Sequence, residues 1–443
     1  MNSDDLTKEV KDRYKKLIDE GADPNEWAYS WRSEYNRGGF KAVDMLNDEV
    51  IHQDKCVGCA ACVTICPVDV FDFVDEKPVD TRHTACVYCE LCVDVCPVLR
   101  PTDNDLGDQI GLLEPKLDSG FGPYGYGCYA RATDKAILEA GQDGGVCTAL
   151  LLHGMQNGTL QGVVAGEEIA DNPQMGSSML QTTAEEIIRG QRSRYTYQPN
   201  TLALVEAMKK NISPLAVVGV PCQVNGVRQM QHSAISLDVA KWYRNNVSLV
   251  IGLFCSEAFT EESVDWLADK LEVKKSDITN INIKGRIEVK LRDGRVEVAS
   301  LKAMGKLARP ACLYCMDYSA DNADIGFGGI GMDKWTYTVI RTKAGHKAWT
   351  ALVDDGWVET KSWEEAPKGK ELVERLSIYK RNRPLPALMP NLTEREEIGN
   401  LDPKNYYRGW EQGNDAKSWR PLPPPPPKKK KLTAAKTNET KND

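Results

Sequence analysis

The stretches CVGCAACVTICP (residues 56–67) and CVYCELCVDVCP (residues 86–97) are two copies of the spacing C-x2-C-x2-C-x3-C-P. Three thiolates at this spacing surround one 4Fe-4S cubane, and the fourth reaches across to the other cluster. Two structural zinc sites are the alternative, but zinc motifs use paired C-x2-C units. We therefore predict a two-cluster ferredoxin-like domain over residues 51–105. Its expected ligands are Cys56, Cys59, Cys62 and Cys96 for one cluster and Cys66, Cys86, Cys89 and Cys92 for the other.

The composition excludes several classes of protein. The chain has 443 residues, with 56 Lys and Arg against 64 Asp and Glu, so its net charge of -8 argues against general nucleic-acid binding. No apolar run approaches the length of a membrane span, and the charged opening MNSDDLTKEVKDRYKK lacks the apolar core of a secretory signal. We expect a cytoplasmic protein whose 14 cysteines stay reduced.

The two ends of the chain are expected to be accessory segments. Apolar residues at helical spacing over residues 4–20 predict an amphipathic helix, and we assign residues 1–50 to docking. Residues 386–443 are expected to be a flexible tail, because five prolines (423–427) precede four lysines (428–431). That positive patch could make peripheral contact with anionic lipid or bind an acidic partner, and deleting it should not affect the chemistry.

The long region between them, residues 120–385, has the texture of an α/β domain. Residues 162–166, 215–220 and 247–254 are short apolar runs typical of central strands that are buried on both faces. Residues 281–298 alternate apolar and polar around Asp293-Gly294, which predicts a hairpin. A mixed sheet is therefore expected.

A third set of thiols lies in this domain. Cys222 and Cys255 each follow a predicted strand, so parallel neighbouring strands would bring them to one sheet edge, where open α/β sheets bind ligands. Cys312 and Cys315 form a further C-x2-C pair. The spacing alone allows more than one interpretation of these cysteines. They could bind a third 4Fe-4S cluster, or Cys222 and Cys255 could be ordinary buried core residues, and a zinc site is a less favoured alternative. Cys128 and Cys147 are left as unligated.

Several motifs in this order resemble the family of beta subunits of coenzyme F420 hydrogenases and dehydrogenases. They are GQDGG (141–145), TALL (148–151), SRY (193–195), GVPCQV (219–224) and the stretch from Arg309 to Gly331. The resemblance covers about residues 125–345 and implies an FAD-binding fold, a 4Fe-4S cluster held by Cys222, Cys255, Cys312 and Cys315, and reaction with the deazaflavin coenzyme F420. Cys147 stands where the family usually has an aliphatic residue, and Arg194 where Lys is common.

The cofactor-binding residues expected on this basis fall into two groups. Gly144 and Gly145 before Thr148 are typical of a glycine turn that opens a helix, whose free N–H groups could bind FAD; a plain turn is the alternative. Ser193, Arg194 and Tyr195 suit a phosphate or adenine, or form a solvated loop. No G-x-G-x-x-G follows a strand, so a nicotinamide site is not supported. A basic run on the hairpin is either a polar sheet face or a site for the acidic tail of F420: Lys284, Arg286, Lys290, Arg292 and Arg295.

The expected function is oxidation of reduced F420 by hydride transfer to FAD, followed by single-electron transfer through three 4Fe-4S clusters to a partner. The partner would be a larger redox complex of the membrane dehydrogenase, hydrogenase, formate dehydrogenase or heterodisulfide reductase type. There are three alternatives. Electrons could flow in the opposite direction and reduce F420, or ferredoxin could drive the reduction of another substrate at the flavin. The chain could also be a ferredoxin-like electron carrier without flavin.

Overall fold

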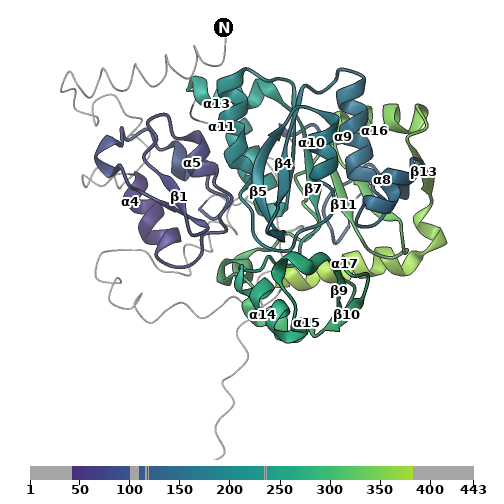
Figure 1. Ribbon diagram of the computed structural model, residues 1–443. Coiled ribbons are helices and arrows are strands. Elements are labelled where there is room, and N and C mark those ends of the chain that lie inside the picture. The colour runs from purple at the N-terminus through teal and green to yellow at the C-terminus, as the bar shows by residue number, and fades with distance from the viewer. Residues whose placement is uncertain are drawn as a thin grey trace, which may run out of the picture.

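The computed structural model describes residues 42–99, 109–114, 117, 119–233, 235 and 237–382. The helix expected over residues 4–20 and the tail from residue 386 lie outside these residues. A small N-terminal block lies beside a large sheet with helices on both faces, and a smaller antiparallel sheet lies below them in Figure 1. No helix in the described part of the chain is long and apolar enough to cross a membrane.

The N-terminal block contains both cysteine motifs. In each motif a short helix starts just before the third cysteine, after a residue in the left-handed region, Ala60 (φ 60°) or Glu90 (φ 61°). The core of this block is formed by cysteines and aliphatic residues, including Leu46 and Val50. Its elements are α4 (Ala42–Leu46), the π-helical turn η2 (Asn47–Ile51), α5 (Ala61–Ile65), the hairpin β1 (Asp72–Val74) and β2 (Lys77–Val79), η3 (His83–Ala85) and α6 (Leu91–Asp94).

The large sheet has eight strands in the order β13-β3-β12-β11-β7-β6-β4-β5. It is mixed, as predicted: β4, β6, β7 and β11 are parallel neighbours, and the outer pairs are antiparallel. The three predicted central strands are confirmed as β4, β6 and β7. The bounds are β3 (Tyr126–Ala132), β4 (Gly162–Ile169), β5 (Asn172–Gln181), β6 (Leu215–Gly219), β7 (Val247–Leu253), β11 (Ile325–Gly328), β12 (Thr336–Ile340) and β13 (Val358–Lys361).

Successive residues of a strand point to opposite faces of the sheet, so the apolar strands of this sheet have two faces to cover, and helices cover both. On β6, Val217 packs into one core and its neighbour Val218 into the other. One face is covered by α11 (Ala203–Lys210), α12 (Pro221–His232) and α13 (Asp238–Asn246). The other is covered by α8 (Lys135–Ala140), α9 (Val146–Gln156), α10 (Ala184–Arg189) and α16 (Lys343–Asp354).

The predicted hairpin is confirmed within a three-stranded antiparallel sheet of order β10-β9-β8. Gly294 takes a positive φ of 90° at the turn between β9 and β10, a conformation that favours glycine. The elements of this region are α14 (Glu262–Leu271), η5 (Lys275–Asp277), β8 (Ile278–Ile283), β9 (Ile287–Leu291), β10 (Val296–Ala299), α15 (Leu301–Met304), η6 (Gly305–Leu307) and η7 (Pro310–Tyr314). After β13 the described chain ends in η8 (Trp363–Glu365) and α17 (Pro367–Asn382).

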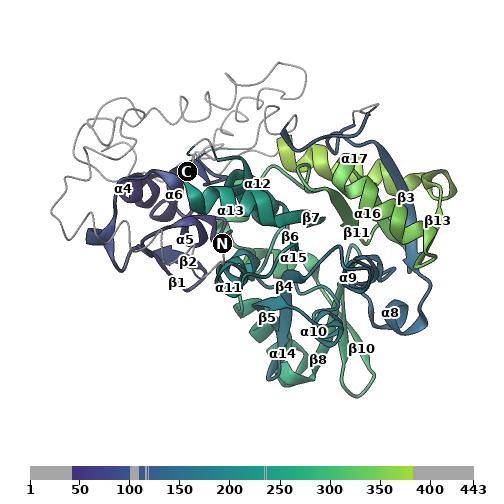
Figure 2. The same ribbon diagram turned by 90° about the horizontal axis from the view of Figure 1, so that it is seen from above.

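The N-terminal block packs directly onto the large domain, next to α11, α12 and α13 (Figure 2). Ile65 and Leu91 from the block are fully buried in the same core as the residues of these helices. Burying one such side chain contributes about 1.5–3 kcal/mol. The Tyr243 hydroxyl also donates to the Thr64 carbonyl at 3.0 Å. The two parts of the chain therefore share one hydrophobic core.

Candidate functional site

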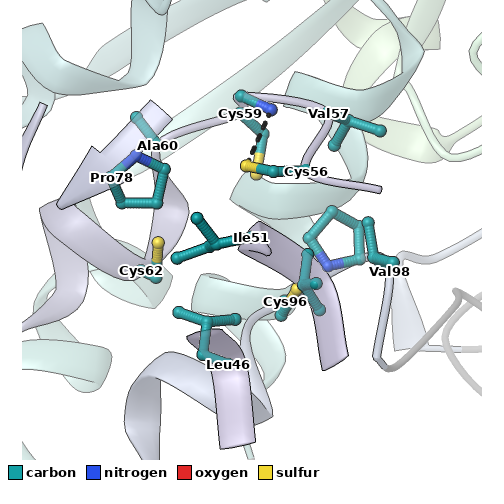
Figure 3. Close-up of a pocket in the computed structure, with 13 residues that line it drawn as sticks. Leu46, Ile51, Cys56, Val57, Cys59, Ala60, Cys62, Pro78, Cys96 and Val98 are labelled. Atoms are coloured by element: carbon teal, nitrogen blue, oxygen red, sulfur yellow. Dashed lines mark hydrogen bonds between the residues drawn. The ribbon is translucent and has the colours of Figure 1, made fainter. Parts of the chain in front are cut away.

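The first set of thiols surrounds a cavity in the N-terminal block. Cys56, Cys59, Cys62 and Cys96 line it together with aliphatic residues, and Figure 3 shows their sulfur atoms around this common space. The empty space between its lining atoms, open solvent included, is about 330 Å³. Within the described ranges, no three His, Cys, Asp or Glu side chains close on a single metal ion. A cubane needs a wider, apolar cage with a thiol at each corner, and this cavity fits that requirement.

Burial raises the pKa of these thiols. The pKa of Cys96 rises to about 12, and that of Cys62 rises well above its ordinary value because Cys59, Cys56 and Cys96 add like charge to the burial. Four thiolates in such a place need positive charge, which iron supplies. The backbone N–H of Gly58 donates to the Cys56 sulfur at 3.4 Å, a contact that stabilises a thiolate.

The second set contains Cys66 with three cysteines of the second motif. Burial raises the pKa of Cys66 to about 11, and the Val70 N–H donates to its sulfur at 3.4 Å. The charge of Cys92 interacts with Cys86, Cys89 and Cys66. This is the crossed grouping that the two copies of the motif lead us to expect.

The third set meets at the edge of the large sheet. β6 and β7 are parallel neighbours, with Gly219 opposite Gly252, so the segments after them leave from the same edge. Cys222 lies in the first turn of α12 and Cys255 just beyond β7. Cys312 lies in η7, and Cys315 is the residue that follows it. Burial raises the pKa of Cys255 to about 12, with further contributions from Cys312 and Cys315. The Ala258 N–H donates to the Cys312 sulfur at 3.3 Å. Each of the four thiols has the other three as electrostatic neighbours.

The third set adjoins the first across α12. Burial raises the pKa of Cys222, and its electrostatic neighbours include Cys59 of the first set as well as its own three partners. Gly226 follows Cys222 by one helical turn, on the same face. A Cβ atom added to Gly226 would lie 3.2 Å from the Cys59 sulfur. A glycine at this position lets the two thiol sets approach.

A buried arginine occupies the junction of the two sets. The Arg309 side chain is 5% exposed and forms an ion pair with Glu76 of the N-terminal block at 2.9 Å. Its guanidinium also donates to the carbonyl of Val57 at 2.8 Å and to that of Glu76 at 3.1 Å. Its positive charge lowers the pKa of both Cys56 and Cys312 against the dominant effect of burial. Arg309 thus links the two thiol sets electrostatically and the two parts of the chain mechanically.

A second buried cation contacts the third set. Lys380, from the last turn of α17, is 4% exposed, and its Nζ donates to the Cys255 carbonyl at 2.7 Å. Sequence reasoning missed this residue. A signal was present, because Lys380 continues the buried stripe Gly369, Val373 and Ser377 at helical spacing.

The glycine motif forms the turn before α9, as predicted. Gly145 is the residue before the helix and has a φ of 69°, with no side-chain cap for the first turn. A Cβ atom on Gly144 would lie 2.5 Å from the Ala130 carbonyl oxygen, so only glycine fits there. Thr148 lies half-buried in the first turn of the helix. The Gly144 N–H donates to Thr336 Oγ1 at 3.1 Å, so the backbone N–H groups suited to an anionic ligand are those at the start of α9.

The Ser193-Arg194-Tyr195 loop lies beside this turn, since the Ser193 N–H donates to the Gln142 side chain at 3.4 Å. Burial raises the pKa of Tyr195, whose electrostatic neighbours include both Asp143 and Cys255. Tyr195 therefore lies between the glycine turn and the third thiol set. The guanidinium of Arg194 is instead directed to its own loop, where it donates to three backbone carbonyls: Arg189, Gly190 and Gln191. These contacts order the loop, while its Nε is buried without a hydrogen-bond partner among the described residues.

The basic run on the hairpin is largely neutralised by acidic neighbours. Lys284 contacts Asp333 at 2.7 Å and Asp143 at 3.4 Å. Arg286 pairs with Glu288, and Arg295 pairs with Asp293 and Glu297. Lys284 is the member of the run that reaches the glycine turn.

Three regions of the chain match known protein families. Residues 128–205 and 212–366 match the N-terminal and C-terminal models of the coenzyme F420 hydrogenase/dehydrogenase beta subunit, and residues 49–101 match a 4Fe-4S dicluster domain. The chain is 36% identical over 273 residues to coenzyme F420 hydrogenase subunit beta of Methanosarcina barkeri, covering 59% of this chain and 90% of that one. It is 30% identical over 346 residues to a subunit of the F420H2 dehydrogenase of Methanosarcina mazei, covering 75% of this chain and 91% of that one.

A solved structure has the same fold. One chain of the F420-reducing NiFe hydrogenase complex from Methanosarcina barkeri superposes with a TM-score of 0.56 at 32% identity, covering 64% of this chain and 96% of that one. The matches span most of the length of these relatives, and the dicluster domain precedes the two family regions. The chain therefore belongs to the family of coenzyme F420 hydrogenase/dehydrogenase beta subunits and carries a 4Fe-4S dicluster domain at its N-terminal side.

Proposed function

We propose that this chain is the F420-oxidising subunit of a larger redox complex, with one FAD and three 4Fe-4S clusters. When bound, FAD accepts the electron pair that reduced F420 gives as a hydride and releases it one electron at a time to clusters that each take one. The observation that carries this proposal is the position of the third thiol set. On one side, the Ala258 N–H donates to the Cys312 sulfur at 3.3 Å and the next N–H, of Phe259, donates to the Tyr195 carbonyl at 2.9 Å. On the other side, a Cβ atom on Gly226, one turn after Cys222, would lie 3.2 Å from the Cys59 sulfur.

The residues of the chain would bind and orient the cofactors. Gly145 and the start of α9 would offer backbone N–H groups at the positive end of the helix, with Thr148 in the first turn. Gly144 would hold this turn against the sheet, since its N–H donates to Thr336 Oγ1. Ser193 and Tyr195 would close the site from the neighbouring loop. Arg194 would hold that loop in place. The thiols, half-buried in the third set, would bind iron. They are Cys222, Cys255, Cys312 and Cys315 in the third set, and the two crossed sets in the dicluster block.

The direction of electron flow is proposed from the extent of the matches. F420 hydrogenase subunit beta of Methanosarcina barkeri matches 59% of this chain, whereas the F420H2 dehydrogenase subunit of Methanosarcina mazei matches 75% of it. The longer match favours a dehydrogenase role. The reverse role, F420 reduction in a hydrogenase complex, is the second candidate, because the hydrogenase subunit has the higher identity, 36% against 30%.

Anaerobic purification of the full chain, followed by iron and flavin analysis, tests the cofactor content. Oxidation of reduced F420 with an artificial one-electron acceptor then tests the activity, with NADH as the control donor. We expect bound FAD and activity with reduced F420 but not with NADH. A protein without flavin, or one that prefers NADH, would contradict the proposal. Purification of the native complex identifies the partner and so distinguishes the two directions.

A further inference from the structure

Lys380 lies where a helix of this kind ordinarily buries an apolar side chain. Together with Gly369, Val373 and Ser377 it forms the buried stripe of α17. An unpaired ammonium group in such a place carries a large desolvation cost, so the site must contain compensating negative charge. α17 begins at Pro367, just after the family match ends at residue 366. Neither the family match nor the proposed activity assigns it a role.

Lys380 lies beside the third thiol set. Its Nζ donates to the Cys255 carbonyl at 2.7 Å, and this hydrogen bond holds the buried ammonium group next to a proposed cluster ligand. A cluster bound by four thiolates would bring to this place the negative charge that a buried ammonium group needs.

The carboxylates near Lys380 have hydrogen-bond partners of their own. Asp317 accepts from the Asp321 backbone N–H at 3.1 Å. Asp321 pairs with Arg381 and lies 3.8 Å from Arg341, both donors being guanidinium groups. Arg381 also donates to the Gly120 carbonyl at 2.7 Å. Lys380 is the cation of α17 that is directed at the thiols, and the adjacent Arg381 serves the carboxylate.

We propose that Lys380 is a fixed counter-ion of the third 4Fe-4S cluster and raises its reduction potential. The inference rests on the proposed function, because it needs a cluster at this thiol set. Adding one electron to a four-cysteine cluster adds one negative charge to the site, and a buried cation nearby stabilises the reduced form more than the oxidised form. Lys380 does not bind iron or substrate; it acts as a positioning residue through its charge.

The test compares charge-removing and charge-keeping variants by redox titration with electron paramagnetic resonance. Lys380→Gln removes the charge and keeps a hydrogen-bond donor, Lys380→Met removes both, and Lys380→Arg keeps the charge. The exposed Lys368→Met, on the same helix, is the matched control. The signal of the third cluster is identified by its loss in Cys312→Ala.

We expect Lys380→Gln and Lys380→Met to shift the third cluster to a more negative potential. The expected shift is about tenfold in the one-electron equilibrium constant, or about 59 mV. Lys380→Arg and Lys368→Met should stay near the wild-type value, and the two dicluster signals should be unchanged in all variants. If both neutral variants lose the third cluster while Lys380→Arg keeps it, the requirement for charge is also supported.

Two results would overturn the inference. One is an unchanged potential in a folded Lys380→Gln variant with a full iron content. The other is an equal shift, or equal loss of iron, in Lys380→Arg and Lys380→Gln, which would show that the contact matters and not the charge. Wild-type protein with only the dicluster irons would instead refute the third cluster itself, and with it this part of the proposed function.

Discussion

The guanidinium carbon of Arg309 lies 3.8 Å from the centre of the Tyr197 ring. Tyr197 is buried, and its electrostatic neighbours are Arg309, Cys222, Cys59 and Cys56. The stacked pair therefore fills the space between the first and third thiol sets. Gly58 completes the fit, because a Cβ atom on it would lie 2.6 Å from the Tyr197 hydroxyl. The junction between the two sets is built from an arginine, an aromatic ring and a glycine.

Replacing Arg309 with Leu should destabilise the junction. The change removes the ion pair with Glu76 and two hydrogen bonds to backbone carbonyls of the dicluster block. Because the Glu76 side chain is 28% exposed, we expect the free energy of unfolding to fall by about 3 kcal/mol, the lower end for a broken buried ion pair. Urea unfolding of the anaerobic protein measures this loss. Arg286→Leu, which removes an exposed pair with Glu288, is the control and should cost less than about 1 kcal/mol. Equal losses in both variants would contradict the prediction.

The full chain should contain about twelve iron atoms, from three four-iron clusters. Cys128 lies in strand β3 and Cys147 in helix α9, in or against the core on the side of the large sheet that α9 covers. Their replacement by Ala should leave the iron content unchanged, whereas Cys312→Ala should remove about four irons. Iron analysis after anaerobic reconstitution measures this. A wild-type content of about eight irons would eliminate the third cluster.

The Cys312→Ala variant should separate flavin reduction from onward transfer. Since Cys312 belongs to the third set and not to the FAD candidates, reduced F420 should still bleach the flavin at close to the wild-type rate in anaerobic stopped flow. The dicluster signals in electron paramagnetic resonance should then fail to appear. Normal reduction of these clusters in a folded, flavin-loaded variant would show that electrons take another route.

Gly226→Ala should disturb the contact between the two parts of the chain. The new methyl group would lie 3.1 Å from the Ala61 side chain and 3.2 Å from the Cys59 sulfur, closer than ordinary packing allows. Overpacking of this kind costs about 1–3 kcal/mol. Reduction of the dicluster block should slow, while flavin reduction by F420 stays normal. Gly305→Ala has only a Glu257 oxygen 3.6 Å away and serves as the control. A variant with wild-type stability and transfer rate would refute the role assigned to Gly226.

Much of the fold could be predicted from local patterns. The apolar runs of β4, β6 and β7 and the turn at Gly294 are signals within a few residues of each other, and the structure confirms them. The positions of Cys222 and Cys255 were also predicted correctly, because parallel strands β6 and β7 end on the same side of the sheet. The crossed grouping of Cys66 and Cys96 followed from the repeated motif.

The surroundings of the thiols could not be predicted in the same way. Glu76 and Arg309 are more than two hundred residues apart, and no local pattern pairs them. Lys380 could be recognised as buried from its helical spacing, but its partner Cys255 depends on where α17 packs. The guanidinium of Arg194, which was expected beside a phosphate, donates to backbone carbonyls three to five residues before it. Long-range packing decided the surroundings of Arg309 and Lys380.

Cys222 and Gly226 lie on one turn of α12, so a single helix sets the distance between the two thiol sets. A carrier module that swings on a tether delivers electrons at a rate set by how often it docks, and solvent viscosity slows it. Here the dicluster block shares a core with α12, and its Cys59 sulfur lies against Gly226 of that helix. In the proposed electron path the block would therefore be a stationary section and not a shuttle, and a moving step would lie beyond it.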